Sequence, residues 1–224
     1  MEKKWIENLM SGKGSNHLNL REHILEIHKR NTGFTENCAQ NFKNNAGRSS
    51  YEWLAEIISP KYHFQVLDLA CGSGPLLEIC DQNFGKNISL FGVDMSDEEL
   101  SLAKQRLKNS EIKLKNSTAQ NLNFIADKSV DVVLCHWALT LMDPLEPVLK
   151  EVKRILSSKG IFGAIVDGND NLSPHYKIIH NIIYKWAKKQ YSNYGSIELG
   201  DPRVRDPLKL QKLIEKIFNK STIK

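Results

Sequence analysis

Two aspartates and a loop of small residues are the groups most clearly placed to do chemistry. Asp68 lies in an apolar run typical of a buried strand, and Ala70, Gly72 and Gly74 follow within a few positions. Small residues allow backbone N–H groups to approach a ligand closely. Asp94 lies at the end of the next predicted strand, where a carboxylate can accept hydrogen bonds from both hydroxyls of a ribose. Together these residues predict a nucleotide-type site.

The elements that must position these residues alternate between strand and helix. This alternation favours a doubly wound, mainly parallel, Rossmann-like α/β sheet. The predicted strands are 66–69, 88–94, 112–117, 130–135 and 161–166, with helices starting at 75, 96 and 145. Three helices are expected before the sheet, from about 20, over 35–43 and over 49–58, and two after it, over 174–191 and 208–218. Ser49 or Ser50 is a candidate helix cap, and Ser96 with Glu99 predicts a capping box.

A single domain is expected from the length of 224 residues. Residues 1–19 read as a flexible lead-in and 20–60 as a helical prelude that caps the core. Residues 61–168 form the ligand-binding core. Residues 169–224 form a helical C-terminal segment whose aromatic residues suit a lid or internal packing.

Composition is that of an ordinary globular protein, with 41% hydrophobic and 25% charged residues. No window is apolar enough for a membrane span, and the N-terminus lacks the pattern of a signal peptide. The four cysteines have neither pairing nor metal-ligand spacing. We therefore expect a cytoplasmic protein with reduced thiols, no metal and no membrane partner.

Positive charge is concentrated near the C-terminus. The net charge is +5, and residues 171–224 hold eleven Lys or Arg against four Asp or Glu. Such a segment could hold an acidic partner such as nucleic acid. A solvated lysine-rich helix face is the alternative that we favour.

Five pieces of sequence resemble, in order, the motifs of the class I S-adenosylmethionine-dependent methyltransferases, of the small-molecule type. They are Val66–Pro75, Phe91–Ser96, Ser117–Gln120, Val130–Cys135 and Val148–Gly160. The resemblance implies S-adenosyl-L-methionine as cofactor, S-adenosyl-L-homocysteine as product and a small-molecule methyl acceptor. A nicotinamide-dependent reductase is disfavoured, because Leu77 stands where a dinucleotide site has its third glycine.

The resemblance also implies roles for individual residues. Asp68 would face the cationic methionine end, Asp94 the ribose and Met95 the adenine face. Thr118 replaces the acidic residue that often contacts the adenine amino group. Arg48 could clamp the methionine carboxylate, or it could be a surface arginine. The expected cofactor-binding residues are Arg48, Asp68, Ala70, Cys71, Gly72, Gly74, Asp94, Met95, Ala119, Gln120, Cys135 and His136.

Methyl transfer from a sulfonium needs an aligned nucleophile and only sometimes a base. His136 is the candidate catalytic base, because it follows the fourth strand at the carboxyl edge of the sheet. A histidine that only shapes the pocket is the alternative. His28 is read as structural.

Other readings stay open at this point. One is an RNA or protein methyltransferase that uses the basic C-terminal segment, and another is a protein that binds the cofactor without turnover. We also expect the sixth and seventh strands of the family to be missing or incomplete. We expect a truncated domain, or an edge of the fifth strand that is covered by a second subunit (a homodimer) or by the C-terminal helices.

Overall fold

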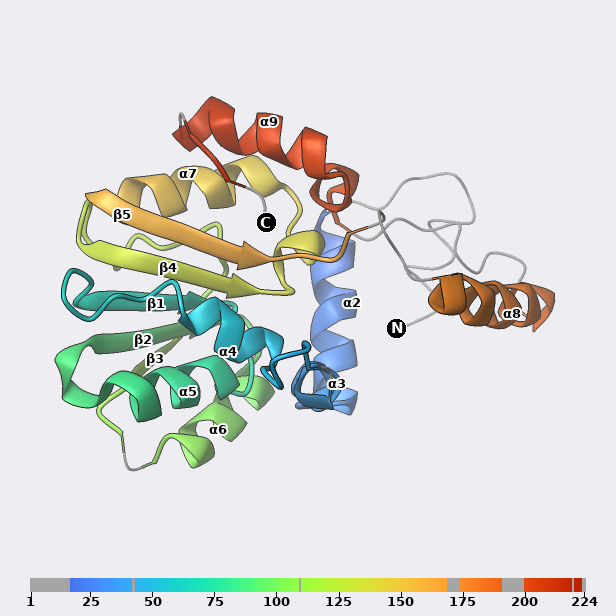
Figure 1. The fold of residues 1–224 in the computed structure, drawn as a ribbon, viewed down its shortest axis with the longest axis horizontal. Coiled ribbons are helices and arrows are strands. Elements are labelled where there is room, and N and C mark those ends of the chain that lie inside the picture. The colour runs from blue at the N-terminus through green and yellow to red at the C-terminus, as the bar shows by residue number, and fades with distance from the viewer. Residues whose placement is uncertain are drawn as a thin grey trace.

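A five-stranded parallel sheet forms the centre of the computed structural model, which describes residues 17–41, 43–108, 110–168, 174–190, 200–218 and 220–222 (Figure 1). The strand order is β3-β2-β1-β4-β5, and all four neighbouring pairs are parallel. The predicted Rossmann-like class is confirmed. The strands are β1 (Gln65–Leu69), β2 (Ser89–Asp94), β3 (Lys113–Asn116), β4 (Val130–His136) and β5 (Leu156–Ile165).

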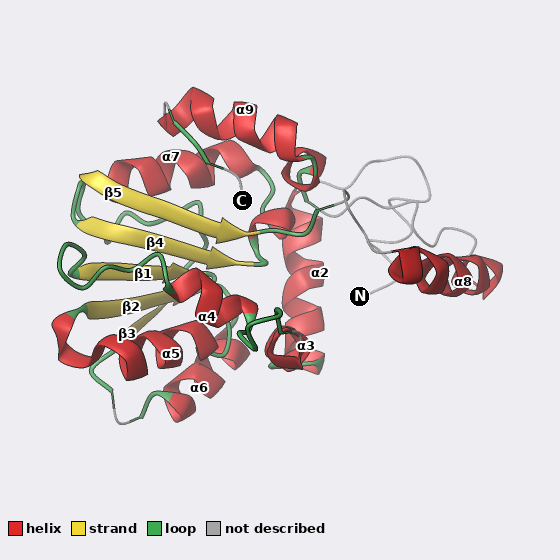
Figure 2. Ribbon diagram, in the orientation of Figure 1, coloured by secondary structure: helices red, strands yellow, loops and turns green. Residues whose placement is uncertain are grey.

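Helices cover both faces of this sheet and also its carboxyl end (Figure 2). One face carries α4 (Ser50–Ala55), α5 (Pro75–Phe84) and α6 (Asp97–Arg106), and the other carries α7 (Leu145–Ile155) and α9 (Pro207–Phe218). The prelude helices α2 (His17–Arg30) and α3 (Phe34–Asn41) lie across the carboxyl ends of the strands. The remaining elements are α8 (Pro174–Gln190) and the short 3-10 turns η1 (Gly85–Asn87), η2 (Leu139–Leu141) and η3 (Pro202–Arg205).

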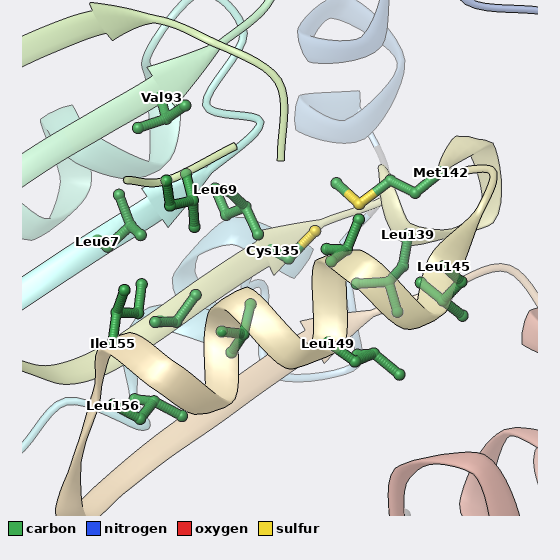
Figure 3. Close-up of a cluster of buried hydrophobic side chains, with 14 of the residues drawn as sticks. Leu67, Leu69, Val93, Cys135, Leu139, Met142, Leu145, Leu149, Ile155 and Leu156 are labelled. Carbon is green, nitrogen blue, oxygen red and sulfur yellow. The ribbon is translucent and has the colours of Figure 1, made fainter. Parts of the chain in front are cut away.

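The core follows from the period of two along the strands and of about 3.6 along the helices. Leu67 and Leu69 of β1 face α7, whereas Val66 faces α4 and α5. Figure 3 shows Leu145, Leu149 and Ile155 of α7 packed against this first set. Each of these three side chains is fully buried, so truncating one to alanine should cost about 2–5 kcal/mol.

Most predicted boundaries agree with the structure within a few residues. The starts of α2 and β5 are earlier than predicted. The first helix begins at His17, inside the predicted lead-in, whose residues 1–16 lie outside the described part. Strand β5 begins at Leu156, five residues before the predicted start at 161. A register shift between Val130 and Val132 lets β5 follow α7 directly.

The two predicted caps have different outcomes. Ser49 caps α4 with a complete capping box, in which Glu52 returns the hydrogen bond. Ser96 caps α6 by accepting the N–H of Glu99, as predicted. The Glu99 carboxylate, however, turns away from Ser96 and bonds to the prelude. The capping-box prediction is therefore only half right.

The C-terminal segment departs most from expectation. The apolar stripe of α8 exists, but Tyr176 and Trp186 are exposed, so the prediction that they pack internally is wrong. Tyr191 and Tyr194 lie outside the described residues. Among the described residues no strand pairs with the free edge of β5; Phe218 of α9 stacks near it on Phe162. A homodimer across that edge stays a prediction.

No described helix combines the length and the apolar character that crossing a bilayer requires. Within the same described ranges, no group of three or more His, Cys, Asp or Glu side chains is placed to hold a metal ion.

Candidate functional site

A cavity of about 430 Å³ lies at the carboxyl ends of β1, β2 and β4. That volume suits a small-molecule ligand. The sheet side of its lining includes Asp68, Ala70, Cys71, Gly72, Asp94, Met95, Ala119, Gln120 and His136. The prelude side includes Leu20, Arg21, Ile24, His28, Glu36 and Tyr51. The structure thus brings nine of the predicted site residues together under a helical cap.

The loop after β1 has a left-handed backbone at three positions. The φ angles are 61° at Ala70, 51° at Gly72 and 82° at Gly74. Glycine adopts this region without strain, whereas alanine does so at a cost. The Gly72 N–H donates to Asp94 Oδ2 at 2.9 Å, and the Cys71 N–H donates to the carbonyl of Val93 at 3.0 Å. The loop is therefore held against the end of β2.

Asp94 is fixed by backbone groups on both sides. Its Oδ2 accepts from Gly72, and its Oδ1 accepts from the Ser96 N–H at 2.8 Å. Burial raises its pKa, and these two N–H groups oppose that rise. Each carboxylate oxygen has a second lone pair, so this pre-oriented group can still accept hydrogen bonds from a diol.

Asp68 is the most buried carboxyl of the site, at 2% exposed. Burial, with a smaller contribution from the charge of Asp94, raises the pKa of Asp68 to about 8. A cation placed beside such a carboxyl would favour its ionised form. The floor of the cavity therefore suits a positively charged ligand group.

The prelude is tied to the core by two buried polar clusters. In the first, Glu99 Oε1 accepts from the Gly33 N–H and contacts His28 Nδ1, both at 2.9 Å. The hydrogen bond with Glu99 raises the pKa of His28. Glu99 is only 3% exposed, so this cluster fixes α2 above Asp94.

The second cluster fixes α3 to the glycine-containing loop. Ser73 Oγ donates to Glu36 at 2.7 Å, and Arg106 Nη2 donates to the same carboxylate at 2.6 Å. Arg106 also donates to the Ser73 carbonyl at 3.0 Å and pairs with Glu78 at 2.7 Å. This network holds the cap and the loop in one arrangement.

His136 ends β4 and faces the prelude. Its Nε2 lies 2.8 Å from Ser50 Oγ, and its ring stacks on Tyr51 with the centroids 3.9 Å apart. Its Nδ1 atom is buried and has no hydrogen-bond partner among the described residues. Burial lowers the pKa of His136 to about 4. The imidazole is therefore neutral near pH 7, and its Nδ1 atom makes no hydrogen bond among the described residues.

The backbone turns sharply just beyond this histidine. Trp137 has a φ of 54°, which is rare for a bulky residue, and its N–H donates to the Ile165 carbonyl at 2.9 Å. Such outliers persist where the surroundings fix them, often at functional sites. Here the turn brings Trp137 and Ala138 into the cavity wall.

Three predicted residues do not line the cavity. Arg48 is half-exposed and forms an ion pair with Glu56, so the structure does not place it on the ligand side as predicted. Cys135 is fully buried in the core, where burial raises the pKa of its thiol to about 12. Gly74 packs against α6, and a Cβ there would lie 3.2 Å from that of Ala103.

Sequence analysis predicted that the prelude caps the core, but it did not identify the helix side chains that line the cavity. Arg21, His28, Glu36 and Glu99 reach the cavity from three helices. The His28–Glu99 contact joins residues 71 apart in the chain. No local spacing could have revealed it, although the amphipathic pattern of α2 did indicate a buried face.

Comparison with known proteins gives one family model. Residues 67–164 match a methyltransferase domain. The chain is 30% identical over 116 residues to a demethylmenaquinone methyltransferase of Lactobacillus johnsonii, which covers 50% of this chain and 47% of that protein. It is 24% identical over 175 residues to the sterol 4-C-methyltransferase of Caenorhabditis elegans, which covers 74% of this chain and 51% of that protein. The chain thus spans about half the length of these curated relatives.

One solved structure with the same fold is geranyl diphosphate C-methyltransferase from Streptomyces coelicolor A3(2), in complex with Mg²⁺, geranyl diphosphate and S-adenosyl-L-homocysteine. The TM-score is 0.52 at 14% identity, and the match covers 75% of this chain and 57% of that chain. This likeness concerns the fold alone.

Proposed function

We propose that the chain is a class I S-adenosylmethionine-dependent methyltransferase and that it methylates a small, largely apolar acceptor. The observation that carries the proposal is the capped cavity with Asp68 and Asp94 at its floor. By their names, two curated relatives act on demethylmenaquinone and on a sterol. Both are predominantly apolar molecules, and we extend that acceptor class to this chain.

The side chains at the floor of the cavity fit S-adenosylmethionine. This cofactor would supply the methyl group, which it carries on a sulfonium. Beside the loop after β1, the charged groups that face the cavity are the carboxyl groups of Asp68 and Asp94. Carboxylates suit a cationic cofactor without phosphate better than they suit a dinucleotide. We assign Asp94 and the loop at Gly72 to the ribose, and Asp68 to the cationic methionine part. Met95 and Ala119 are assigned to the adenine. Residues 61–168 would then be the cofactor-binding core and 20–60 its cap.

His136 is proposed to orient the acceptor or to take its proton. If Nε2–H donates to Ser50 Oγ, Nδ1 carries the lone pair, and the acceptor would have to approach this buried atom for the imidazole to take a proton. The stack on Tyr51 holds the ring in place. A neutral imidazole is also compatible with a cationic methyl donor nearby, because it adds no like charge.

The acceptor is proposed to lie between the prelude and the end of β4. Leu20, Ile24, Leu141, Met142 and Trp137 line that part of the cavity. Their apolar surfaces would be removed from water by an apolar acceptor, which stabilises binding by about 25 cal/mol per Å². A concave lining with this much apolar surface favours a small molecule over an RNA or protein target.

Turnover tests this proposal. The protein would be incubated with S-adenosylmethionine and either a demethylmenaquinone analogue or a sterol, and S-adenosylhomocysteine would be quantified. We expect product with an apolar acceptor and none with RNA. Product formed with RNA alone would overturn the acceptor class. Cofactor binding without turnover on either acceptor would favour a cofactor-binding protein that is not an enzyme.

A further inference from the structure

The apolar face of α8 is exposed. Ile178, Ile179, Ile182, Ile183 and Trp186 are spaced so that they form one stripe along the helix. All five side chains are more than half exposed, with Ile182 at 62% and Trp186 at 67%. Leaving this much contiguous apolar surface in water is unfavourable, and such patches mark interaction sites.

The charge on α8 has one sign. The helix carries Lys177, Lys185, Lys188 and Lys189 and contains no Asp or Glu. At 100° per residue, Lys185 borders the apolar stripe and Lys189 projects within its arc near the end of the helix, whereas Lys177 and Lys188 lie on the opposite side. An apolar face with a tryptophan beside a lysine-rich face is typical of a helix that lies in a membrane interface.

The position of α8 matches that role. Strand β5 ends at Ile165, and α8 begins at Pro174. Figure 1 shows α8 beyond the carboxyl ends of the strands, on the side of α2. The cavity lies at the same end of the sheet. The helix is also not one that could span a bilayer.

We propose that α8 docks on the surface of an anionic lipid bilayer. The isoleucines and Trp186 enter the boundary between headgroups and acyl chains, and Lys185 and Lys189 contact lipid phosphates. Lys177 and Lys188, on the opposite side, add to the attraction of the helix to the anionic surface. This inference goes beyond the proposed function and needs no turnover. The sequence had indicated no membrane partner, because it has no apolar segment long enough to cross one; a helix lying in the surface needs no such length.

Two other partners for the apolar stripe of α8, a second copy of the chain and an RNA, fit this helix less well. If two copies paired through their stripes, Lys185 and Lys189 of each helix would be brought to the interface, with no acidic residue of α8 to compensate their charge. Like charges placed together across an interface are costly. An RNA could bind the lysines, but it would leave the four isoleucines without an apolar partner.

Sedimentation with lipid vesicles tests the proposal on the full chain. Vesicles of phosphatidylcholine with phosphatidylglycerol should bind the protein, and pure phosphatidylcholine should bind it weakly. Replacing Lys185, Lys188 and Lys189 by Gln should reduce partitioning on the order of 100-fold, at about 1 kcal/mol per lysine. Ile182→Ser with Trp186→Ser should also abolish most binding.

The matched control replaces Lys209, Lys212 and Lys216 by Gln, which removes the same charge from exposed positions of α9. This control should bind vesicles much more tightly than the α8 variant, and thermal melting would show that both remain folded. Equal losses in the two variants would overturn the proposal. The proposal would also be overturned if the wild-type protein did not bind anionic vesicles. Two further results would overturn it: a dimer that Ile182→Ser dissociates, with no vesicle binding, or tighter binding of RNA than of vesicles.

Discussion

The Nε2 atom of His136 lies 2.8 Å from the Oγ atom of Ser50. This contact joins the end of β4 to the first turn of α4, across residues 86 apart in the chain. This hydrogen bond therefore helps to hold the end of β4 against the cap, and the Nδ1 atom of His136 makes no hydrogen bond among the described residues.

His136→Ala should lower kcat on the order of 100-fold if the imidazole orients or deprotonates the acceptor. The KM for S-adenosylmethionine should change little. Ser50→Ala should give a smaller loss, because the ring stays stacked on Tyr51. Steady-state kinetics checks both variants.

Burial lowers the pKa of His136 to about 4. The wild-type kcat should therefore show no inflection near pH 6.5 that depends on His136. An inflection there that His136→Ala removes would contradict the assignment.

The second prediction concerns Asp68 and pH. Burial raises its folded-state pKa to about 8, above an unfolded value of about 3.9. The folded state then holds a proton that the unfolded state has released. The contribution to stability is complete below about pH 4 and is lost as pH rises to about 8, by at most about 1.4 kcal/mol per pH unit.

Urea unfolding between pH 5 and 8 measures this effect. Wild type should lose free energy of unfolding more steeply than Asp68→Asn, which has no such proton. Binding of the cationic cofactor should strengthen with pH in wild type and much less in the variant. Parallel slopes for the two proteins would show that Asp68 ionises normally.

The third prediction concerns the attachment of α2. Glu99→Ala removes the partner of His28 and of the Gly33 N–H, which should cost about 2 kcal/mol of unfolding free energy. It should also speed hydrogen exchange in α2. The matched control is Glu26→Ala, which breaks an exposed pair with Arg30 and should cost less than about 1 kcal/mol. Similar costs for the two variants would argue against a cap held by Glu99.

Two arginines allow a direct comparison. Arg21 lines the cavity, whereas Arg48 pairs with Glu56 outside it. We expect Arg21 to bind an anionic ligand group such as the methionine carboxylate. Arg21→Ala should therefore weaken S-adenosylhomocysteine binding roughly 10-fold, and Arg48→Ala should leave it unchanged. The reverse order in a binding titration would restore the role that the sequence suggested for Arg48.

The sequence predicted what local patterns encode. The strand, loop and helix around Asp68, and the position of Asp94, depend on short runs of residues and were found in place. The contacts of Glu99 could not be predicted in this way, because a capping box and a distant partner compete for one carboxylate. The stripe of α8 was also visible in the sequence. Its exposure was not, because amphipathic periodicity does not say what covers the apolar face.

Calorimetric titration with S-adenosylmethionine and S-adenosylhomocysteine tests the central claim most directly. Wild type should bind both at one site. Asp94→Asn should weaken binding on the order of 100-fold, because a charged acceptor of two hydrogen bonds is lost. Asp97→Asn removes an exposed carboxylate three residues on, outside the cavity lining, and should bind as wild type does. Wild type that binds neither compound, or an Asp94→Asn variant that binds as tightly as wild type, would contradict the account.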